Sequence, residues 1–152
     1  MVALLYPLVN IYRFLEELNV KFYKIASVDL VNLPLIEKVG KTGKPVILST
    51  GMSNSSEIKR ALSILAFGLL DGEVPSVEAF KEPYNSNEGR SILKESVTIL
   101  HCTYEYPAPH DQVNLAVIPM LQKEFDISVG YSDHTEGIQV APLAAAIGAS
   151  VI

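Results

Sequence analysis

The chain has 152 residues, of which 49% are apolar, and this suits one domain with a substantial core, since domains commonly hold about 100–200 residues. Its net charge of −5 and the lack of a basic run argue against nucleic acid or an anionic membrane as the main partner. The single cysteine, Cys102, excludes a disulfide within the chain and fits a reducing compartment.

The apolar stretch Val2–Val9 is interrupted by Pro7 and follows no positive charge, unlike a signal peptide. No run reaches the roughly 20 apolar residues of a membrane-spanning helix, so we expect a cytoplasmic protein without a membrane partner.

The first third of the chain alternates predicted helices and strands. Apolar residues recur at three- and four-residue steps over 8–18, which predicts a helix at the start. A first strand is predicted over 22–26. Asn32 then serves as the N-cap of a short helix that ends near Gly40, and a second strand follows over 46–50.

The middle third contains a second helix and a compositional oddity. Asn54, followed three residues later by Glu57, has the pattern of a capping box at the start of the helix. The segment 71–96 is rich in Gly, Pro and Asn, with short helices predicted around 76–81 and 89–93. We interpret it as an insertion on the helical side of the fold and not as a linker between domains.

The last third continues the alternation. We expect a third strand over 97–103, a helix near 115–125, a fourth strand from 127, and an Ala-rich helix over about 137–147 that ends at a glycine. Residues 149–152 begin another apolar strand. This alternation predicts a parallel sheet joined by right-handed crossovers.

Each of the four predicted strands is rich in Val or Ile or other apolar residues and ends in hydroxyl or ionisable residues. Such runs fit strands buried in a parallel sheet, and polar groups at the carboxyl ends of parallel strands are where α/β folds build active sites. Ser27, Ser49 and Ser132 end three of these strands and would form a ring of donors suited to an anion. A complete TIM barrel takes about 250 residues, so we expect an α/β barrel of which this chain supplies roughly half.

The strand ends closely resemble those of the sialic acid synthase family, the N-acetylneuraminate synthases with their legionaminate and pseudaminate relatives. The resemblance covers the chain except 71–96, and its specificity comes from four motifs in the same order. The motifs are Tyr23-Lys24-Ile25-Ala26-Ser27, Gly43-Lys44-Pro45-Val46-Ile47-Leu48-Ser49-Thr50-Gly51-Met52, Leu100-His101-Cys102-Thr103 with Glu105-Tyr106-Pro107, and Gly130-Tyr131-Ser132-Asp133-His134-Thr135.

This resemblance implies an aldolase-type TIM barrel that condenses phosphoenolpyruvate with N-acetylmannosamine or a related acetamido sugar, giving a nine-carbon 2-keto sugar acid and phosphate. It implies a divalent metal, Mn²⁺ or Mg²⁺, that polarises the sugar aldehyde, and a homodimer for the full-length protein. Residues 1–152 would then be a partial barrel, with strands 4 to 7, the start of strand 8 and the insertion at about 71–96. The first three strands, the second metal-binding histidine and the C-terminal antifreeze-like domain of the family would be absent.

The resemblance also implies roles for six residues. Lys24 lies in an apolar run, where an unpaired charge is costly, and its ammonium would contact the phosphate and carboxylate of phosphoenolpyruvate. Lys24 and Tyr106 are the implied catalytic residues. The implied phosphoenolpyruvate ligands are Lys24, Ser27, Ser49 and Ser132, the implied sugar-acceptor residue is Tyr106, and the implied metal ligand is His134.

Several neighbouring residues have open or lesser roles. Thr50 either joins the anion site or caps the next turn, and Asp133 either orients nearby groups or caps the following helix. His101 and Cys102 are adjacent in a strand and so point to opposite faces, which argues against a nucleophilic pair. We expect Cys102 to be an inert core thiol. Tyr104 stands where many members of the resembled family have Asn or a small polar residue.

Three hypotheses follow. The first is a synthase that uses N-acetylmannosamine, and the second is a legionaminate or pseudaminate synthase with the same chemistry and another acceptor. The third is a catalytically inert fragment or scaffold, because a half-barrel leaves two strand edges unpaired and this chain has only one of the two implied metal histidines.

Overall fold

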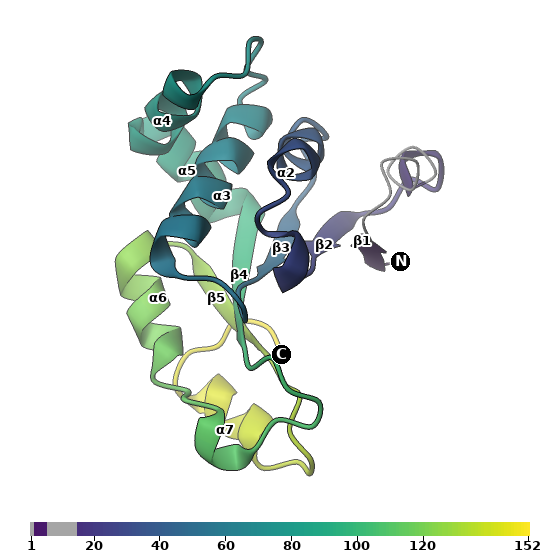
Figure 1. The fold of residues 1–152 in the computed structure, drawn as a ribbon, viewed down its shortest axis with the longest axis vertical. Coiled ribbons are helices and arrows are strands. Elements are labelled where there is room, and N and C mark those ends of the chain that lie inside the picture. Colours follow the sequence, from purple (N-terminus) through teal and green to yellow (C-terminus); the bar gives the residue numbers. More distant parts are fainter. Residues whose placement is uncertain (1, 6–14) are drawn as a thin grey trace.

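The structure is a computed structural model that describes residues 2–5 and 15–152 (Figure 1). Its centre is a five-stranded parallel sheet whose strands lie in the order of the sequence. The strands are β1 (Val2–Leu5), β2 (Phe22–Ile25), β3 (Val46–Ser49), β4 (Val97–Cys102) and β5 (Ser128–Ser132). The predicted α/β class and parallel pairing are therefore confirmed.

Helices connect the strands and pack on one face of the sheet. They are α2 (Leu33–Gly40), α3 (Ser55–Leu69), α4 (Val77–Asn85), α5 (Asn87–Ser96), α6 (Val117–Phe125) and α7 (Val140–Ala146). The start of α3 has the predicted capping box, because Asn54 Oδ1 accepts from the backbone N–H of Glu57 and the Glu57 carboxylate accepts from the backbone N–H of Asn54. Such a cap satisfies backbone donors that a helix start otherwise leaves unpaired.

Alternate side chains along each strand serve two different purposes. One set faces the helices and belongs to the core, together with apolar residues of α2, α3 and α6. These core strand residues are Tyr23, Ile25, Val46, Leu48, Val97, Ile99, Val129 and Tyr131. The other set includes Lys24, Ile47 and Thr98, which are half-buried and lie outside this core. The period of two thus directs Lys24 and Thr98 to the face opposite the helices.

The beginning of the chain differs from the prediction. Residues 2–5 form β1, a strand that the sequence analysis missed, and β1 pairs in parallel with β2 from Val2 opposite Phe22. A four-residue apolar run is too short for its periodicity to separate a strand from a helix. The chain therefore has one strand more than the resemblance implied. The predicted helix over 8–18 lies mostly outside the described residues, although 15–17 are helical.

The segment 71–96 lies on the helical side, as predicted. It forms α4 and α5, both longer than expected, and both helices pack on α3 (Figure 1). Phe80 of α4 meets Phe67 of α3 edge to face, with 5.0 Å between the ring centroids. The insertion therefore adds helical packing and leaves the strand ends open.

The last residues are bonded to the edge of the sheet. Helix α7 begins at Val140, later than predicted, and the glycine expected at its end, Gly148, has a φ of +107°. Beyond it, the Ser150 N–H donates to the carbonyl of Val129 over 2.9 Å, and the Tyr131 N–H donates to the carbonyl of Val151 over 2.8 Å. These two bonds attach the end of the chain to β5, but residues 149–152 do not form the strand that their apolar pattern predicts. Among the described residues, no helix combines the length and the apolar character that crossing a bilayer requires.

Candidate active site

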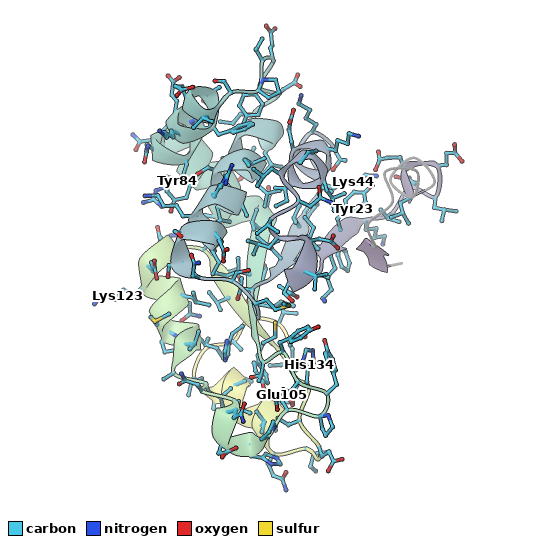
Figure 2. The ribbon with its side chains drawn as sticks, viewed as in Figure 1. Tyr23, Lys44, Tyr84, Glu105, Lys123 and His134 are labelled. Carbon is cyan, nitrogen blue, oxygen red and sulfur yellow. The ribbon has the colours of Figure 1, made fainter. Side chains whose placement is uncertain are left out.

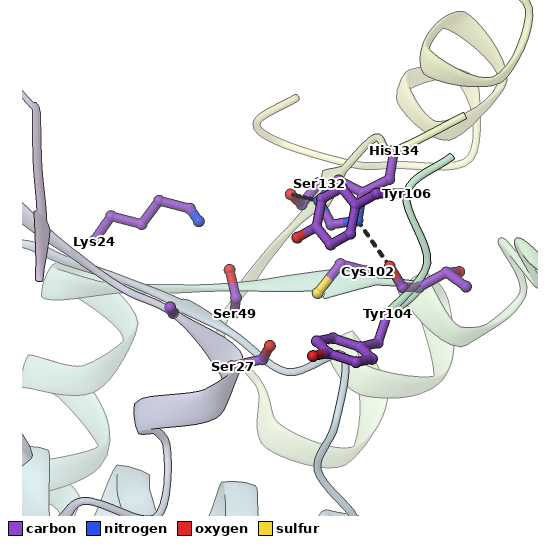
Figure 3. A pocket seen from close by; sticks show the side chains of 10 residues that line it. Lys24, Ser27, Ser49, Cys102, Tyr104, Tyr106, Ser132 and His134 are labelled. Atoms are coloured by element: carbon purple, nitrogen blue, oxygen red, sulfur yellow. Dashed lines mark hydrogen bonds between the residues drawn. The ribbon is translucent and has the colours of Figure 1, made fainter. Parts of the chain in front are cut away.

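A cavity at the carboxyl ends of the strands brings together all six residues predicted for the site (Figure 3). Its volume is about 50 Å³. It is lined by Lys24, Ala26, Ser27, Ser49, Cys102, Thr103, Tyr104, Tyr106, Ser132 and His134. The expectation that these strand ends converge is met, while the role of each residue stays a prediction.

The parallel register explains why residues far apart in the sequence meet here. Cys102 is paired with Ser132 at the ends of β4 and β5, and Ser49 is the last residue of β3. Lys24 lies in β2, and Ser27 begins the 3-10 turn that follows β2. Because parallel strands end at the same edge of a sheet, the sequential strand order places these side chains around one opening.

The part of the cavity formed by β2 and β3 suits an anion. Lys24 forms no ion pair within the described part of the chain, and its side chain extends into the space that the hydroxyls of Ser27 and Ser49 also face (Figure 3). Ser49 is 3% exposed, and its Oγ has no hydrogen-bond partner among the described residues. Burying a hydroxyl without a partner costs about 1–3 kcal/mol, so a ligand that bonds to Ser49 would remove this cost. A cation among hydroxyl donors is a suitable site for phosphate or carboxylate.

Two hydrogen bonds hold His134 in one tautomer. Its Nδ1 lies 2.8 Å from the carbonyl oxygen of Thr103, and because a carbonyl only accepts, Nδ1 carries the proton. In the neutral ring Nε2 is then an acceptor, and Ser132 Oγ donates to it over 3.1 Å. Metal-binding histidines commonly have this arrangement, with one nitrogen bonded to a carbonyl and the other unprotonated.

Among the described residues, a metal ion would find one histidine ligand of this kind, His134. Among residues 2–5 and 15–152 there is no group of three or more His, Cys, Asp or Glu side chains that could hold a metal ion. Asp133, next to His134, is engaged locally, because its Oδ1 accepts from both the backbone N–H and the hydroxyl of Thr135. Asp133 therefore closes a turn and does not cap α7. The donor set fits a divalent metal at one position, His134 Nε2.

Two tyrosines lie on the open side of the cavity. Tyr106 is 75% exposed, and its ring is stacked on the imidazole of His134. Tyr104 is also exposed and lines the cavity. Both rings are placed where a second substrate could contact them without displacing a core residue.

Thr50, His101 and Cys102 also have defined positions near the strand ends. The Thr50 hydroxyl donates to the carbonyl of Leu100 over 2.9 Å, so Thr50 ties β3 to β4 and does not line the cavity. His101 Nε2 bonds the carbonyl of Val113 over 2.7 Å on the helical side, whereas Cys102 lines the cavity. The expected opposite orientation of this pair is confirmed. Cys102 is buried as expected, with 7% of its surface exposed, and it also lines the cavity.

Burial explains why Cys102 is nevertheless a poor nucleophile. Loss of solvent raises the pKa of its thiol, and hydrogen bonds from the backbone of Gly51 and Thr50 together with the charge of Lys24 oppose this only in part. A thiol with a raised pKa holds its proton at neutral pH. The sequence analysis gave no role to two further lining residues, Ala26 and Thr103. They follow β2 and β4 directly, so their positions alone could have identified them.

Comparison with known proteins finds relatives that are sugar acid synthases. The profile of the NeuB family matches residues 9–152. N,N'-diacetyllegionaminic acid synthase of Campylobacter jejuni is 41% identical over 138 residues, covering 91% of this chain and 35% of that protein. Human N-acetylneuraminate-9-phosphate synthase is 36% identical over 141 residues, covering 92% of this chain and 32% of that protein. The chain thus spans about a third of the length of these curated relatives.

A solved structure has the same fold. The N-acetylneuraminic acid (sialic acid) synthetase from Leptospira borgpetersenii, crystallised in complex with citrate, superimposes with a TM-score of 0.73 at 33% sequence identity. The match covers 96% of this chain and 42% of that chain.

Proposed function

The chain belongs to the NeuB family, and on this premise we propose that it forms the phosphoenolpyruvate pocket of an enzyme that condenses phosphoenolpyruvate with an acetamido sugar. The product would be a nine-carbon 2-keto sugar acid, with release of phosphate. The observation that carries this proposal is the convergence on one cavity of the Lys24 ammonium and the buried Ser49 hydroxyl, for which the described part of the chain provides no ion-pair or hydrogen-bond partner, respectively. Phosphoenolpyruvate has two anionic groups, and such a cavity would neutralise and orient them.

Each predicted residue has a task in this reaction. Lys24 would neutralise the phosphate and carboxylate, while Ser27, Ser49 and Ser132 would donate hydrogen bonds to phosphate oxygens. The enol carbon would attack the aldehyde carbon of the sugar, and water would add at the carbon that carries the phosphate ester, so that phosphate leaves. A divalent metal, Mn²⁺ or Mg²⁺, held in part by His134, would supply Lewis acid polarisation of the aldehyde.

The acceptor would approach from the open side of the cavity. Tyr106 covers His134 there, so a sugar whose aldehyde lies near His134 would contact the tyrosine ring. N-acetylmannosamine is our first candidate acceptor. The alternative is a diacetylated sugar, as in legionaminate or pseudaminate synthesis, and it is favoured by the 41% identity to a diacetyllegionaminic acid synthase.

We further propose that the chain is part of a larger TIM barrel in a cytoplasmic homodimer. The sequential parallel strands, the helices on one face, and the polar groups at the carboxyl ends support a barrel. The backbone bonds of Ser150 and Val151 to β5 support a further strand at that edge.

Phosphoenolpyruvate binding and turnover test the proposal separately. Phosphoenolpyruvate titrated into the ¹⁵N-labelled chain should shift amide signals at Ser27, Ser49 and Ser132, and Lys24→Met should abolish these shifts. Lys123→Met, on the exposed surface of α6, is the matched control and should bind normally. Shifts that persist undiminished in Lys24→Met would contradict the assigned pocket.

Turnover requires the complete site. A longer protein that includes the flanking coding sequence should release phosphate from phosphoenolpyruvate only with an acetamido sugar and Mn²⁺ or Mg²⁺, and His134→Ala should abolish this. The 152-residue chain alone should show no turnover, because it supplies one metal ligand of the predicted kind. Turnover by the chain alone would refute its role as a partial site, and a longer protein that is also inactive would favour the scaffold hypothesis.

A further inference from the structure

A second cavity lies on the helical side of the fold, between α3 and the inserted helix α4. Its volume is about 300 Å³. It is lined by Ser56, Lys59, Arg60 and Ser63 of α3 and by Val77, Phe80 and Lys81 of α4. Positions separated by three and four residues lie on one face of a helix, so one face of α3 and one face of α4 form the opposing walls. We call this site the α3–α4 cavity.

Three cations border the α3–α4 cavity. Lys59, Arg60 and Lys81 are exposed and form no ion pair within the described part of the chain. The Lys59 ammonium lies 5.3 Å from the centroid of the Tyr84 ring, and Tyr84 is only 6% exposed. This cation–π contact holds one of the charges in place before any ligand binds. The site is therefore locally positive in a chain whose net charge is −5.

Two of the three carboxylates of the same two helices are directed elsewhere. None of the residues that line the cavity is acidic. Glu57 of α3 accepts from the backbone N–H of Asn54 in the capping box, and Glu82 of α4 lines a different cavity, with Phe67 and Gly72. The third, Glu78 of α4, is exposed and does not line the α3–α4 cavity. Among the described residues, no ion pair neutralises the three cations.

The floor of the cavity is apolar. Val77 is 60% exposed, although it lies beside Phe80, which packs on Phe67 of the core side. Ligand pockets typically enclose about 300–1,000 Å³ and combine an apolar lining with a few polar groups that fix orientation. The α3–α4 cavity lies at the small end of that range, and its lining combines the apolar Val77 and Phe80 with five polar or charged residues.

We propose that the α3–α4 cavity binds a small organic anion that has an apolar body and a phosphate or carboxylate head group. The head group would lie between Arg60 and Lys81, and the apolar body would cover Val77 and Phe80. An inorganic anion would lack the apolar contact, and a neutral aromatic molecule would lack the charge. The site shares no residue with the strand-end cavity, and it differs from that cavity in offering an apolar surface beside its cations.

Titration with a model ligand tests this proposal. We expect 2-naphthyl phosphate to bind the ¹⁵N-labelled chain saturably, with amide shifts confined to α3 and α4. Inorganic phosphate and 2-naphthol should each bind at least about 10-fold more weakly, a factor that corresponds to about 1.4 kcal/mol. 2-Naphthoate distinguishes a preference for carboxylate from one for phosphate. Arg60→Gln and Lys81→Gln should each weaken binding about 10-fold, and Lys123→Gln on α6 is the matched control that should not.

Arg60→Gln and Lys81→Gln each replace an exposed cation that forms no ion pair among the described residues. The fold of both variants should therefore persist, and circular dichroism measures this. The proposal is overturned if 2-naphthyl phosphate does not saturate, if 2-naphthol binds as tightly, or if affinity is unchanged in both Arg60→Gln and Lys81→Gln. Shifts centred on Ser49 and Ser132 would also overturn it, because they would assign the ligand to the strand-end cavity.

Discussion

The ring of Tyr106 lies stacked on the imidazole of His134, with 4.2 Å between the ring centroids and 28° between the ring planes. The backbone N–H of Ala108 also donates to the carbonyl of His134 over 2.8 Å. With the bond from His134 Nδ1 to the Thr103 carbonyl, the loop after β4 is attached to the end of β5 at three points. An exposed tyrosine thus covers one face of the residue predicted to bind metal, which explains how a side chain on a loop can have a defined position.

Removal of the Tyr106 ring should change the environment of His134 more than the stability of the fold. In Tyr106→Ala the imidazole loses the shielding of the stacked ring, so its carbon-bound proton signals should move downfield in ¹H–¹³C spectra. Tyr106→Phe keeps the ring and should retain the wild-type shifts. The free energy of unfolding should change by no more than about 0.5 kcal/mol, because Tyr106 is exposed. Unchanged His134 signals in Tyr106→Ala would show that the stack does not form in solution.

The tautomer of His134 is a second prediction. Since Thr103 offers only an acceptor to Nδ1, the neutral ring should carry its proton on Nδ1, and ¹⁵N imidazole shifts should show this directly. Ser132→Ala removes the donor to Nε2 but should leave the proton on Nδ1, because the Thr103 carbonyl is unchanged. A neutral ring protonated on Nε2 would contradict the hydrogen bonds described here.

Most of the site could be predicted because strand ends obey simple rules. The apolar runs that end in Ser49 and Ser132 fix where β3 and β5 stop, and parallel pairing then brings the two hydroxyls to one edge. Tertiary contacts decided the rest. The sequence left two roles for Thr50, in the anion site or as a cap, and the structure shows neither, because the register of β3 against β4 places its hydroxyl on the Leu100 carbonyl. Likewise β1 is a strand because it pairs with β2, which no local pattern reveals.

Glu16 should contribute to stability in a pH-dependent manner. It accepts hydrogen bonds from the Lys44 ammonium, over 2.8 Å, and from the Tyr23 hydroxyl. Figure 2 labels Lys44 and Tyr23, which lie close to each other. Both bonds lower the pKa of Glu16 from its ordinary value of 4.5, and the bond from Lys44 has the larger effect. A lowered pKa in the folded state means that the stabilisation is fully present above 4.5 and is lost as the pH falls through the folded-state pKa.

Glu16→Gln should therefore lower the free energy of unfolding at pH 7 by less than about 1 kcal/mol, since the pair is partly exposed and screened by solvent. Urea denaturation at several pH values measures this, and the difference from wild type should shrink as the pH falls below 4.5. Glu17→Gln alters an exposed neighbour and is the matched control. A difference that is the same at acidic and neutral pH would refute the role of the Glu16 charge.

Ser49 and Thr50 are adjacent hydroxyl residues that should respond oppositely to loss of the hydroxyl. Thr50→Val removes a buried hydrogen bond to the Leu100 carbonyl, which keeps its bond from the Thr50 N–H, so it should destabilise the fold by about 0.5–1.5 kcal/mol. Ser49→Ala removes a buried hydroxyl that has no partner among the described residues, so it should leave stability unchanged or raise it by up to about 1 kcal/mol. Phosphate or phosphoenolpyruvate binding should behave in the reverse way, weakened by Ser49→Ala and retained in Thr50→Val. Urea denaturation and amide-shift titration of both variants measure the two effects. A marked loss of stability in Ser49→Ala would mean that its hydroxyl has a structural partner and is not reserved for a ligand.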